Sequence, residues 1–268
     1  MKHKQKTSWQ PVSRWYTQAI GDQGGYFHQR VVFPKLLDQL KLKAGDKVLD
    51  LGCGQGVFER QLAKTVGYLG LDVAPDLIKY ATEHRRWPEH QFQQLDLTRP
   101  WPIKDKDFTH ALMILSAQNI DQLDRVLVQA EARLQPKARL VLVLNHPCFR
   151  IPRQSSWGID PQNKLQFRRV NRYLSPLKIP ITAHPGKRNS ALTWSFHLSL
   201  STYSQYLSQA GFVITQLEEW GSDKTSQGKA AKMENRARDE FPLFLTIFAQ
   251  KSPVSGEHMQ KRVDDRQN

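Results

Sequence analysis

Three aspartates at the ends of short apolar segments are the residues of this sequence best placed to do chemistry. Asp50, Asp72 and Asp96 each follow a run with the composition of a buried strand. Asp50 is followed at once by a loop that contains three glycines, Gly52, Gly54 and Gly56. Glycine lets a ligand approach the backbone closely, and a carboxylate offers two acceptor oxygens to a pair of hydroxyl donors. The pattern therefore predicts a site for a nucleotide-like ligand where these strands end.

The stretch from Lys47 to Gly56, KVLDLGCGQG, allows three interpretations. It resembles motif I of class I methyltransferases that use S-adenosylmethionine (SAM), whose usual form is D-L-G-C-G-x-G. The dinucleotide-binding pattern G-x-G-x-x-G would require glycine where this chain has Val57. The third interpretation is an ordinary strand-to-helix turn, but such a turn rarely matches so many positions of a binding motif. SAM has a positive sulfonium and no phosphate, so an acid beside the loop favours the first interpretation.

The resemblance implies SAM as the cofactor and supplies a set of expected cofactor contacts. Asp72 would bind the ribose hydroxyls, Asp96 the adenine amino group, and the N–H of Leu97 a ring nitrogen. Asp72 could instead cap a helix, and Asp96 could cap a turn before Pro100. The full set of expected cofactor-binding residues is Asp50, Gly52, Cys53, Gly54, Gly56, Asp72, Val73, Asp96, Leu97 and Leu115.

Candidates for the methyl-transfer chemistry lie after the predicted fifth strand, residues 139–144, and in the segments around the core. Transfer from SAM depends mainly on positioning the acceptor, and a general base helps when the acceptor is a hydroxyl. His146 and His197 are the candidate bases, with a hydrogen-bonded structural histidine as the alternative for each. Residues expected to contact the substrate are Tyr16, Tyr26, His28, Arg168 and Arg169.

The residues after the predicted fourth strand bear on the type of acceptor. Enzymes that methylate amino groups of DNA and RNA typically have Asn/Asp-Pro-Pro-aromatic there, whereas this chain has Ser-Ala-Gln-Asn at 116–119. Cys148 follows Pro147 and is the one candidate for the nucleophile of a cytosine C5 enzyme. A reactive cysteine needs an electropositive setting, so we consider this role a minor alternative.

The alternation of apolar segments predicts an α/β protein with a mostly parallel sheet. The resemblance implies a Rossmann-like sheet of seven strands with an antiparallel last strand, and residues 147–192 break the alternation as an inserted lid after strand five. We expect a helix directly after the glycine loop, a helix capped by Ser201, and a loop around residues 224–238. The predicted organisation is an N-terminal aromatic and helical cover (1–44), a methyltransferase domain (45–250) with a substrate-lid insertion (147–192), and a disordered tail (251–268).

Charge and composition limit the class of protein. The chain has 268 residues, 39% hydrophobic, with a net charge of +14. Residues 147–200 hold nine lysines and arginines against a single acid, Asp160. This excess favours an anionic substrate or a nucleic-acid surface, or is simply solvated. No apolar run is long enough to span a membrane, and the N-terminus lacks the apolar region of a secretory signal. With two cysteines and no metal-ligand spacing, we expect a cytoplasmic protein with no membrane partner and no metal.

The sequence thus predicts a SAM-dependent methyltransferase that transfers a methyl group to an oxygen or nitrogen of a small molecule. One alternative is an RNA or ribosome-associated methyltransferase that holds phosphates with the basic segment at 147–200. Another is a binding module that keeps the fold without catalysis. The retention of Asp50, Asp72 and Asp96 together with the glycine loop disfavours this last interpretation. The sequence does not indicate the oligomeric state.

Overall fold

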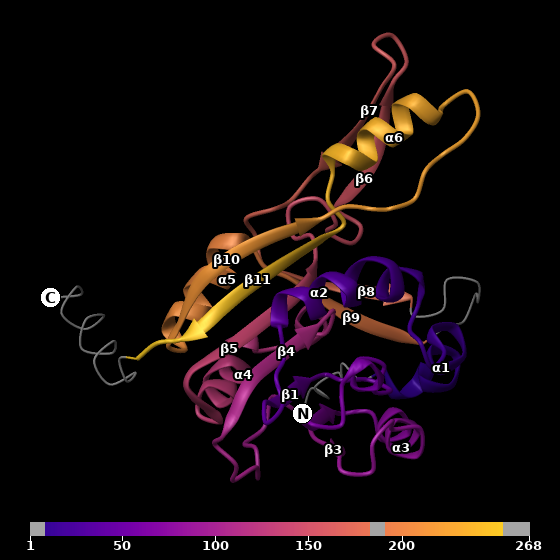
Figure 1. The fold of residues 1–268 in the computed structure, drawn as a ribbon. Helices are drawn as coiled ribbons and strands as arrows, with labels where there is room; N and C mark the ends of the chain where they lie inside the picture. Colours follow the sequence, from indigo (N-terminus) through magenta and orange to yellow (C-terminus); the bar gives the residue numbers. More distant parts are fainter. Residues whose placement is uncertain (1–8, 183–190, 254–268) are drawn as a thin grey trace, which may run out of the picture.

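The fold is seen in a computed structural model that describes residues 9–182 and 191–253 (Figure 1). Its centre is a sheet of seven strands: β1 (Lys47–Leu51), β2 (Gly67–Asp72), β3 (Gln91–Gln94), β4 (Phe108–Ile114), β5 (Leu134–Asn145), β10 (Phe212–Trp220) and β11 (Phe244–Lys251). The strand order is β10-β11-β5-β4-β1-β2-β3. Neighbours from β3 to β5 are parallel, and β11 is antiparallel to both β5 and β10. The predicted fold class is confirmed.

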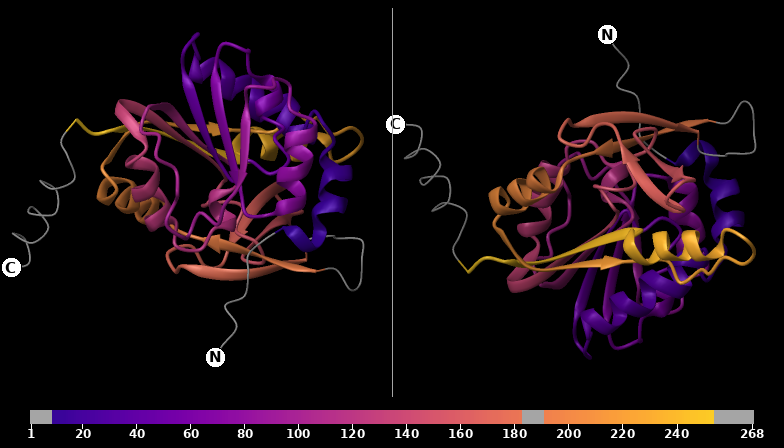
Figure 2. Two further views of the ribbon diagram at one scale, coloured as in Figure 1. Left: turned by 90° about the horizontal axis from the view of Figure 1, so that it is seen from below. Right: turned by 90° about the horizontal axis from the view of Figure 1, so that it is seen from above.

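The central strands are apolar almost throughout because helices cover the sheet on both faces (Figure 2). On one face α4 (Leu123–Glu131) and α5 (Leu200–Gln209) pack Leu127 and Leu207 into a core with Leu49. On the other face α2 (Phe33–Leu40) packs Leu36 with Val48. This two-sided packing fixes the strand ends from which the candidate site residues project.

The N-terminal segment and part of the insertion lie across the carboxyl ends of the strands. The segment comprises η1 (Gln10–Val12), α1 (Ser13–Ile20) and a π-helical turn, η2 (His28–Val32), that runs into α2. α1 lies beside α3 (Pro75–Glu83), which follows β2. Figure 1 shows α1 and the strands β8 and β9 on the side toward which β1 and β4 point. This edge of the sheet is also where the glycine loop lies.

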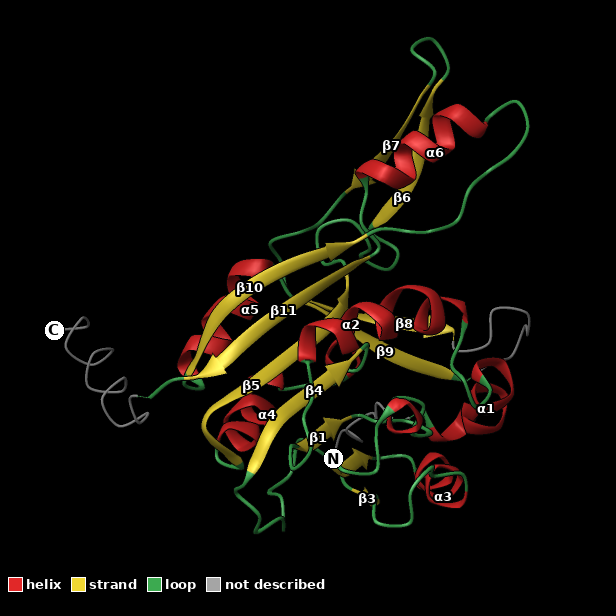
Figure 3. Cartoon of the chain, viewed as in Figure 1, coloured by secondary structure: helices red, strands yellow, loops and turns green. Residues whose placement is uncertain are grey.

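The insertion after β5 is built from two antiparallel hairpins rather than irregular chain (Figure 3). β6 (Ser155–Asp160) pairs with β7 (Leu165–Val170), and β8 (Leu177–Thr182) pairs with β9 (Leu192–His197). The β6–β7 hairpin stands out from the sheet beside α6 (Ala231–Glu240), whereas β9 packs against the short helix η4 (Ala117–Asn119) that follows β4. The predicted insertion is present, and only one of its hairpins lies over the sheet edge.

Four local predictions were wrong. The glycine loop continues into turns and a single 3-10 turn, η3 (Glu59–Gln61), because buried contacts of Glu59 hold this segment. α5 is capped by Ser199, whose hydroxyl accepts from the N–H of Thr202, and not by Ser201. Strand β5 begins at Leu134, earlier than expected, and α6 occupies the stretch predicted as a loop. The predicted disordered tail lies outside the described residues from position 254 onward, while β11 extends to Lys251.

Within residues 9–182 and 191–253, no helix has both the length and the apolar character that a membrane crossing requires. In the same ranges, no three His, Cys, Asp or Glu side chains gather as metal ligands.

Candidate functional site

The glycine loop has a conformation that only glycine can adopt at two of its positions. Gly52 has φ +80°, and a Cβ there would lie 2.5 Å from the Cβ of Ser116. Gly56 has φ +76°, and a Cβ there would lie 2.8 Å from the ring of Phe92. Positive φ and close neighbours each exclude larger residues. The loop is therefore pressed against the end of β4 on one side and β3 on the other.

The N–H groups of this loop point into the protein. Those of Gly52 and Cys53 donate to the carbonyl of Leu71 at 2.8 and 3.0 Å. The N–H of Gly54 donates to Asp72 Oδ2 at 3.0 Å, and that of Gly56 to the carbonyl of Cys53. These four N–H groups are thus used within the protein, and no α-helix follows the loop to add free donors. A loop with committed donors suits a cationic ligand better than a phosphate.

Asp72 is fixed by the backbone at the end of β2. Its Oδ1 accepts from the N–H of Ala74 at 2.9 Å, and its Oδ2 accepts from Gly54. Burial raises the pKa of Asp72, and these backbone donors oppose that rise. Each carboxylate oxygen has a second lone pair, so the group can still accept from a pair of hydroxyls. Val73, next in the chain, is exposed beside it.

Asp50 is a buried acid with an unsatisfied oxygen. Its side chain is 2% exposed, and Oδ2 accepts from the hydroxyl of Tyr68 at 2.8 Å. Oδ1 has no hydrogen-bond partner. Burial raises the pKa of Asp50 to about 7; the hydroxyl of Tyr68 opposes this, and the charge of Asp72 adds to it. A buried acceptor without a donor fits a cationic or donor-bearing ligand, so this residue is compatible with SAM.

Tyr16 lies over the glycine loop. A Cβ built on Gly54 would lie 3.9 Å from its ring and 4.0 Å from its hydroxyl oxygen. Burial raises the pKa of Tyr16 to about 12, with further contributions from the charges of Asp72 and Cys53. The ring of Trp9 lies 5.3 Å away, centroid to centroid. The structure therefore brings this predicted substrate residue to the predicted cofactor residues.

Hydrogen bonds attach the N-terminal segment to the chain that follows the loop. Gln55 Nε2 donates to the carbonyl of Gly21 at 2.6 Å, and Arg60 Nε donates to that of Asp22 at 2.8 Å. The hydroxyl of Tyr80 on α3 donates to Asp22 Oδ1 at 2.8 Å. The proposed cover is thus held to both the glycine loop and α3.

The remaining expected cofactor residues lie at the ends of β3 and β4. Asp96 Oδ1 accepts from the N–H and the hydroxyl of Thr98, so the turn cap that we considered as its alternative role is formed. Leu97 is buried in the core. Leu115 has φ +55°, a conformation that is rare for residues other than glycine and is often associated with functional sites. Any contact of these three residues with an adenine stays a prediction.

The two candidate bases differ in what their nitrogens do. His146 Nδ1 accepts from the N–H of Cys148 at 3.2 Å, so Nε2 carries the proton and meets Glu219 Oε1 at 2.6 Å. His197 Nε2 meets the carbonyl of Tyr173 at 2.6 Å and must donate to it, which leaves the lone pair on Nδ1. Burial lowers the pKa of both histidines. Both nitrogens of His146 are therefore engaged, whereas His197 keeps an unprotonated Nδ1 in a buried position.

The buried side of β9 is its polar side, which the sequence pattern did not reveal. Thr193, Ser195 and His197 are buried, while Trp194 and Phe196 point outward. Lys178 Nζ lies 4.9 Å from the ring centroid of Trp194 and 5.7 Å from that of Phe196, so the outer face is partly covered. Thr193 is 2% exposed, and its Oγ1 has no hydrogen-bond partner. Because β9 packs against η4, this polar side belongs to the same sheet edge as the glycine loop.

Two other predicted substrate residues of the N-terminal segment, Tyr26 and His28, do not lie over the glycine loop as Tyr16 does. Tyr26 is exposed and donates to Asp223 Oδ2 at 3.1 Å, beside the chain that leads to α6. His28 Nδ1 accepts from the N–H of Gly25, and its Cβ lies close to where Gly24 would carry one. Burial lowers the pKa of His28. Tyr26 is therefore tied to the α6 side, and His28 stabilises the turn before η2.

The insertion residues also separate. Arg168 donates to the carbonyl of Phe149 at 3.1 Å and to Ser155 Oγ at 2.8 Å, so it holds the β6–β7 hairpin to its base. Arg169 is exposed on the same strand. The structure thus places Arg168 and Arg169 on the hairpin away from the glycine loop.

Burial raises the pKa of Cys148, which disfavours the thiolate that a nucleophilic role requires.

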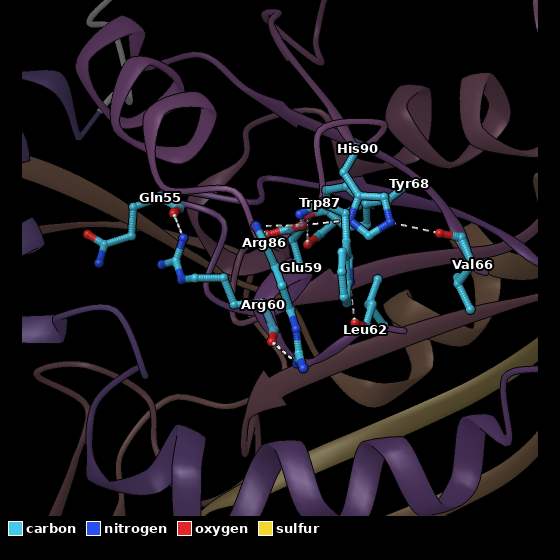
Figure 4. Close-up of polar contacts among 10 residues, drawn as sticks. Gln55, Glu59, Arg60, Leu62, Val66, Tyr68, Arg86, Trp87 and His90 are labelled. Atoms are coloured by element: carbon cyan, nitrogen blue, oxygen red, sulfur yellow. Dashed lines mark hydrogen bonds and ion pairs between the residues drawn. The ribbon is translucent and has the colours of Figure 1, made fainter. Parts of the chain in front are cut away.

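A buried acid that the sequence did not single out stabilises the segment after the loop (Figure 4). Glu59 is fully buried and accepts from the N–H groups of Arg86 and Trp87. Its Oε1 lies 2.6 Å from His90 Nδ1, while His90 Nε2 lies 2.8 Å from the carbonyl of Val66. A single Glu in an apolar stretch reads as an exposed helix residue, so sequence alone offered no signal for this cluster.

Comparisons with known proteins agree with this geometry. Residues 48–137 match the model of a family described as the methyltransferase domain. A demethylmenaquinone methyltransferase of Tropheryma whipplei is 31% identical over 111 residues, which cover 40% of this chain and 46% of the relative. A 2-phytyl-1,4-naphtoquinone methyltransferase of Trichormus variabilis is 28% identical over 54% of this chain and 60% of the relative. The chain spans about half the length of the curated relatives it matches.

Solved structures resemble a larger share of the chain. A SAM-dependent methyltransferase from Mesorhizobium loti has a TM-score of 0.63 and 22% identity, over 86% of this chain and all of that one. A protein from Listeria monocytogenes with the same description has a TM-score of 0.60 and 25% identity, over 81% of this chain and 97% of that one. The resemblance to class I SAM-dependent methyltransferases is therefore confirmed, in the sequence of residues 48–137 and in the fold.

Proposed function

We propose that this protein is a methyltransferase that binds SAM at the glycine loop and transfers its methyl group to a small molecule. The observation that supports this most directly is the arrangement of Asp50, Asp72 and Tyr16 around Gly54. A buried acid with an unsatisfied oxygen, Asp50, and a partly buried acid, Asp72, stand beside a loop in which the N–H groups of all three glycines are already hydrogen-bonded. That set favours a ligand with a positive charge and a ribose over one with phosphates.

Bound SAM would supply an activated methyl group on a sulfonium, which needs no further activation by the protein. Asp72 would accept from the ribose hydroxyls, and Asp50 would face the positively charged part of the ligand. Tyr16, over Gly54, would shield this part from water. Positioning and exclusion of water are the main contributions expected of the protein in such a displacement.

The acceptor would lie on the other side, against the polar face of β9. Thr193 Oγ1 is buried without a partner, so an acceptor that hydrogen-bonds to it would satisfy an otherwise costly group. His197 is neutral near pH 7 because its pKa is lowered, and its Nδ1 carries a lone pair. We assign His197 the role of general base for an acceptor that loses a proton, and we assign His146 a structural role.

The relatives suggest the chemical class of the acceptor. Two of them are named for the methylation of demethylmenaquinone and of a phytyl naphthoquinone, both small molecules. Because this chain spans only part of those relatives, we propose the class and not the compound: a small, largely apolar molecule with one polar group for β9.

Calorimetry with S-adenosylhomocysteine tests the cofactor site. Asp72→Ala should weaken binding by about 1–3 kcal/mol, since it removes the acceptor for two hydroxyls. Asp38→Ala, an exposed acid on α2, is the matched control and should bind like the wild type. Absence of binding to the wild-type protein would overturn the proposed function, and unchanged affinity of the Asp72 variant would remove that residue from the site.

Thr193→Val tests the acceptor side with a variant of nearly the same shape. We expect unchanged affinity for S-adenosylhomocysteine and slower transfer of label from SAM into the small-molecule fraction of a cell extract. Label in RNA or protein in place of small molecules would contradict the proposed acceptor class.

A further inference from the structure

The β6–β7 hairpin exposes apolar side chains on both of its faces. The register pairs Trp157 with Arg168 and Gly158 with Phe167, so successive residues point to opposite faces. Ile159 is 58% exposed, and Trp157, Phe167 and Val170 are each exposed by more than a third. Leu174, just after the hairpin, is 75% exposed. Such a concentration of apolar surface on a projecting element indicates contact with a partner.

Basic residues surround these apolar side chains. Residues 153–172 hold five arginines and lysines and one acid, Asp160. The Asp160 carboxylate is used in the turn, where it accepts from the N–H groups of Gln162 and Asn163 and from Asn163 Nδ2. Lys164 and Arg169 are exposed. The neighbouring α6 has as many acids as bases, so the positive charge belongs to the hairpin itself.

The hairpin is rooted at the edge of the sheet that carries the candidate site. It follows β5, whose carboxyl end is parallel to that of β4 and lies at the same edge. From there it projects away from the body of the protein, together with α6 (Figure 1). A surface bound by its tip would therefore face the edge where Tyr16 and the glycine loop lie.

The exposed groups fit a lipid surface better than a nucleic acid. The ring of Trp157 is occupied, with Arg168 Cζ 4.8 Å from its centroid and Phe241 in edge contact. Phe167 lies against Gly158, where a Cβ would come within 2.4 Å of the ring. The two most exposed apolar side chains here are aliphatic, Ile159 and Leu174, while Phe167 and Trp157 keep smaller exposed fractions of 44% and 39%. Aliphatic side chains cannot stack on bases, but they partition into the region between lipid headgroups and acyl chains.

We propose that the β6–β7 hairpin binds the surface of anionic lipid bilayers, with Ile159 and its apolar neighbours inserted and Lys164 and Arg169 against the headgroups. The sequence-based expectation of no membrane partner considered only spanning segments, and a surface contact requires none. This proposal goes beyond methyl transfer and does not depend on the cofactor assignment.

Vesicle flotation of the full chain tests the proposal. Vesicles of phosphatidylcholine with about 30 mol % phosphatidylglycerol should retain the wild-type protein, and vesicles of phosphatidylcholine alone should retain much less. Ile159→Ser should lower the partition coefficient about fivefold to tenfold, as expected for one partly inserted apolar side chain. The double reversal Lys164→Glu/Arg169→Glu should lower it by about 25-fold or more.

Matched controls separate this surface from general stickiness and charge. Leu217→Ser removes an equally exposed apolar residue on β10, and Lys104→Glu reverses a charge before β4. Both should float like the wild type, and all variants should keep the wild-type melting temperature within a few degrees. Failure of the wild type to float, or equal losses in the controls, would overturn the proposal. A third result would also overturn it: the protein binds a mixed RNA sample tightly, the double charge reversal abolishes that binding, and Ile159→Ser changes neither RNA binding nor vesicle binding.

Discussion

Replacement of Asp50 by Asn should change how stability depends on pH. Burial raises the folded-state pKa of Asp50 from 3.8 to about 7. In the unfolded chain the group ionises near its ordinary value, so between pH 4 and 7 the folded state holds a proton that the unfolded state has released. By linkage, this group lowers the free energy of unfolding as pH rises through that window, and the loss is complete above about pH 7.

The magnitude follows from the size of the shift. About three pKa units correspond to a free energy on the order of 4 kcal/mol. Asn cannot ionise, and its side-chain oxygen can keep the hydrogen bond from Tyr68. Its amide nitrogen then lies in a buried position without an acceptor, which costs about 1–3 kcal/mol at any pH. Protonated Asp50 has the same unpaired donor in its O–H group, so we expect Asp50→Asn to be about as stable as the wild type near pH 4.5 and more stable near pH 8.

Urea unfolding followed by circular dichroism, on protein without added cofactor, measures this difference across the pH range. Subtracting the wild-type curve cancels the other titrating groups, and Asp38→Asn on the exposed side of α2 serves as the control. A difference between Asp50→Asn and wild type that stays constant from pH 4.5 to 8 would refute the reasoning. The same variant should bind SAM more weakly than wild type above pH 7, because the buried negative charge is lost.

Three further outcomes are expected. His197→Gln should lower the rate of methyl transfer by about 100-fold or more without changing cofactor affinity, whereas His146→Gln should mainly lower the melting temperature. Because the pKa of His197 is lowered, the wild-type rate should fall only when the pH drops below the usual imidazole range. A rate that stays constant down to pH 5 would contradict the role of His197 as a base. Gly52→Ala should abolish binding of S-adenosylhomocysteine, and adding Ser116→Gly should restore part of it by removing the clash; no restoration would mean that the positive φ dominates. Glu59→Ala should cost about 3–5 kcal/mol in urea unfolding because the buried His90 and the part-buried N–H groups of Arg86 and Trp87 lose their acceptor. A cost under about 1 kcal/mol would show that water replaces it.

The sequence predicted the sheet well because its strands depend on local patterns, while the roles of the acids stay predictions. Buried parallel strands are continuous apolar runs, and a motif of ten residues fixed where Asp50 and the glycines lie. The antiparallel last strand, β11, was expected from the family resemblance. The position of Asp72 at the end of β2 was expected from the apolar run that precedes it.

The predictions that failed depended on contacts between distant parts of the chain. A helix after Gly56 was a reasonable reading of Val57, Phe58 and Leu62, yet Glu59 is held by Arg86 and Trp87 in a turn instead. Alternation within residues 193–200 is typical of a strand, and β9 is one. Its polar side is buried where β9 packs against η4, and no single-strand pattern shows which side a neighbour will cover.

The three hydrogen bonds that tie Gly21 and Asp22 to Gln55, Arg60 and Tyr80 have a kinetic consequence. At about 1 kcal/mol each, breaking these three bonds alone would cost some 3 kcal/mol, so the population with the N-terminal segment lifted from the loop would be about one percent at most. A nucleoside enclosed beneath Tyr16 would wait for that rare opening before it could leave. Release of the demethylated cofactor, rather than methyl transfer, would then limit the rate of turnover.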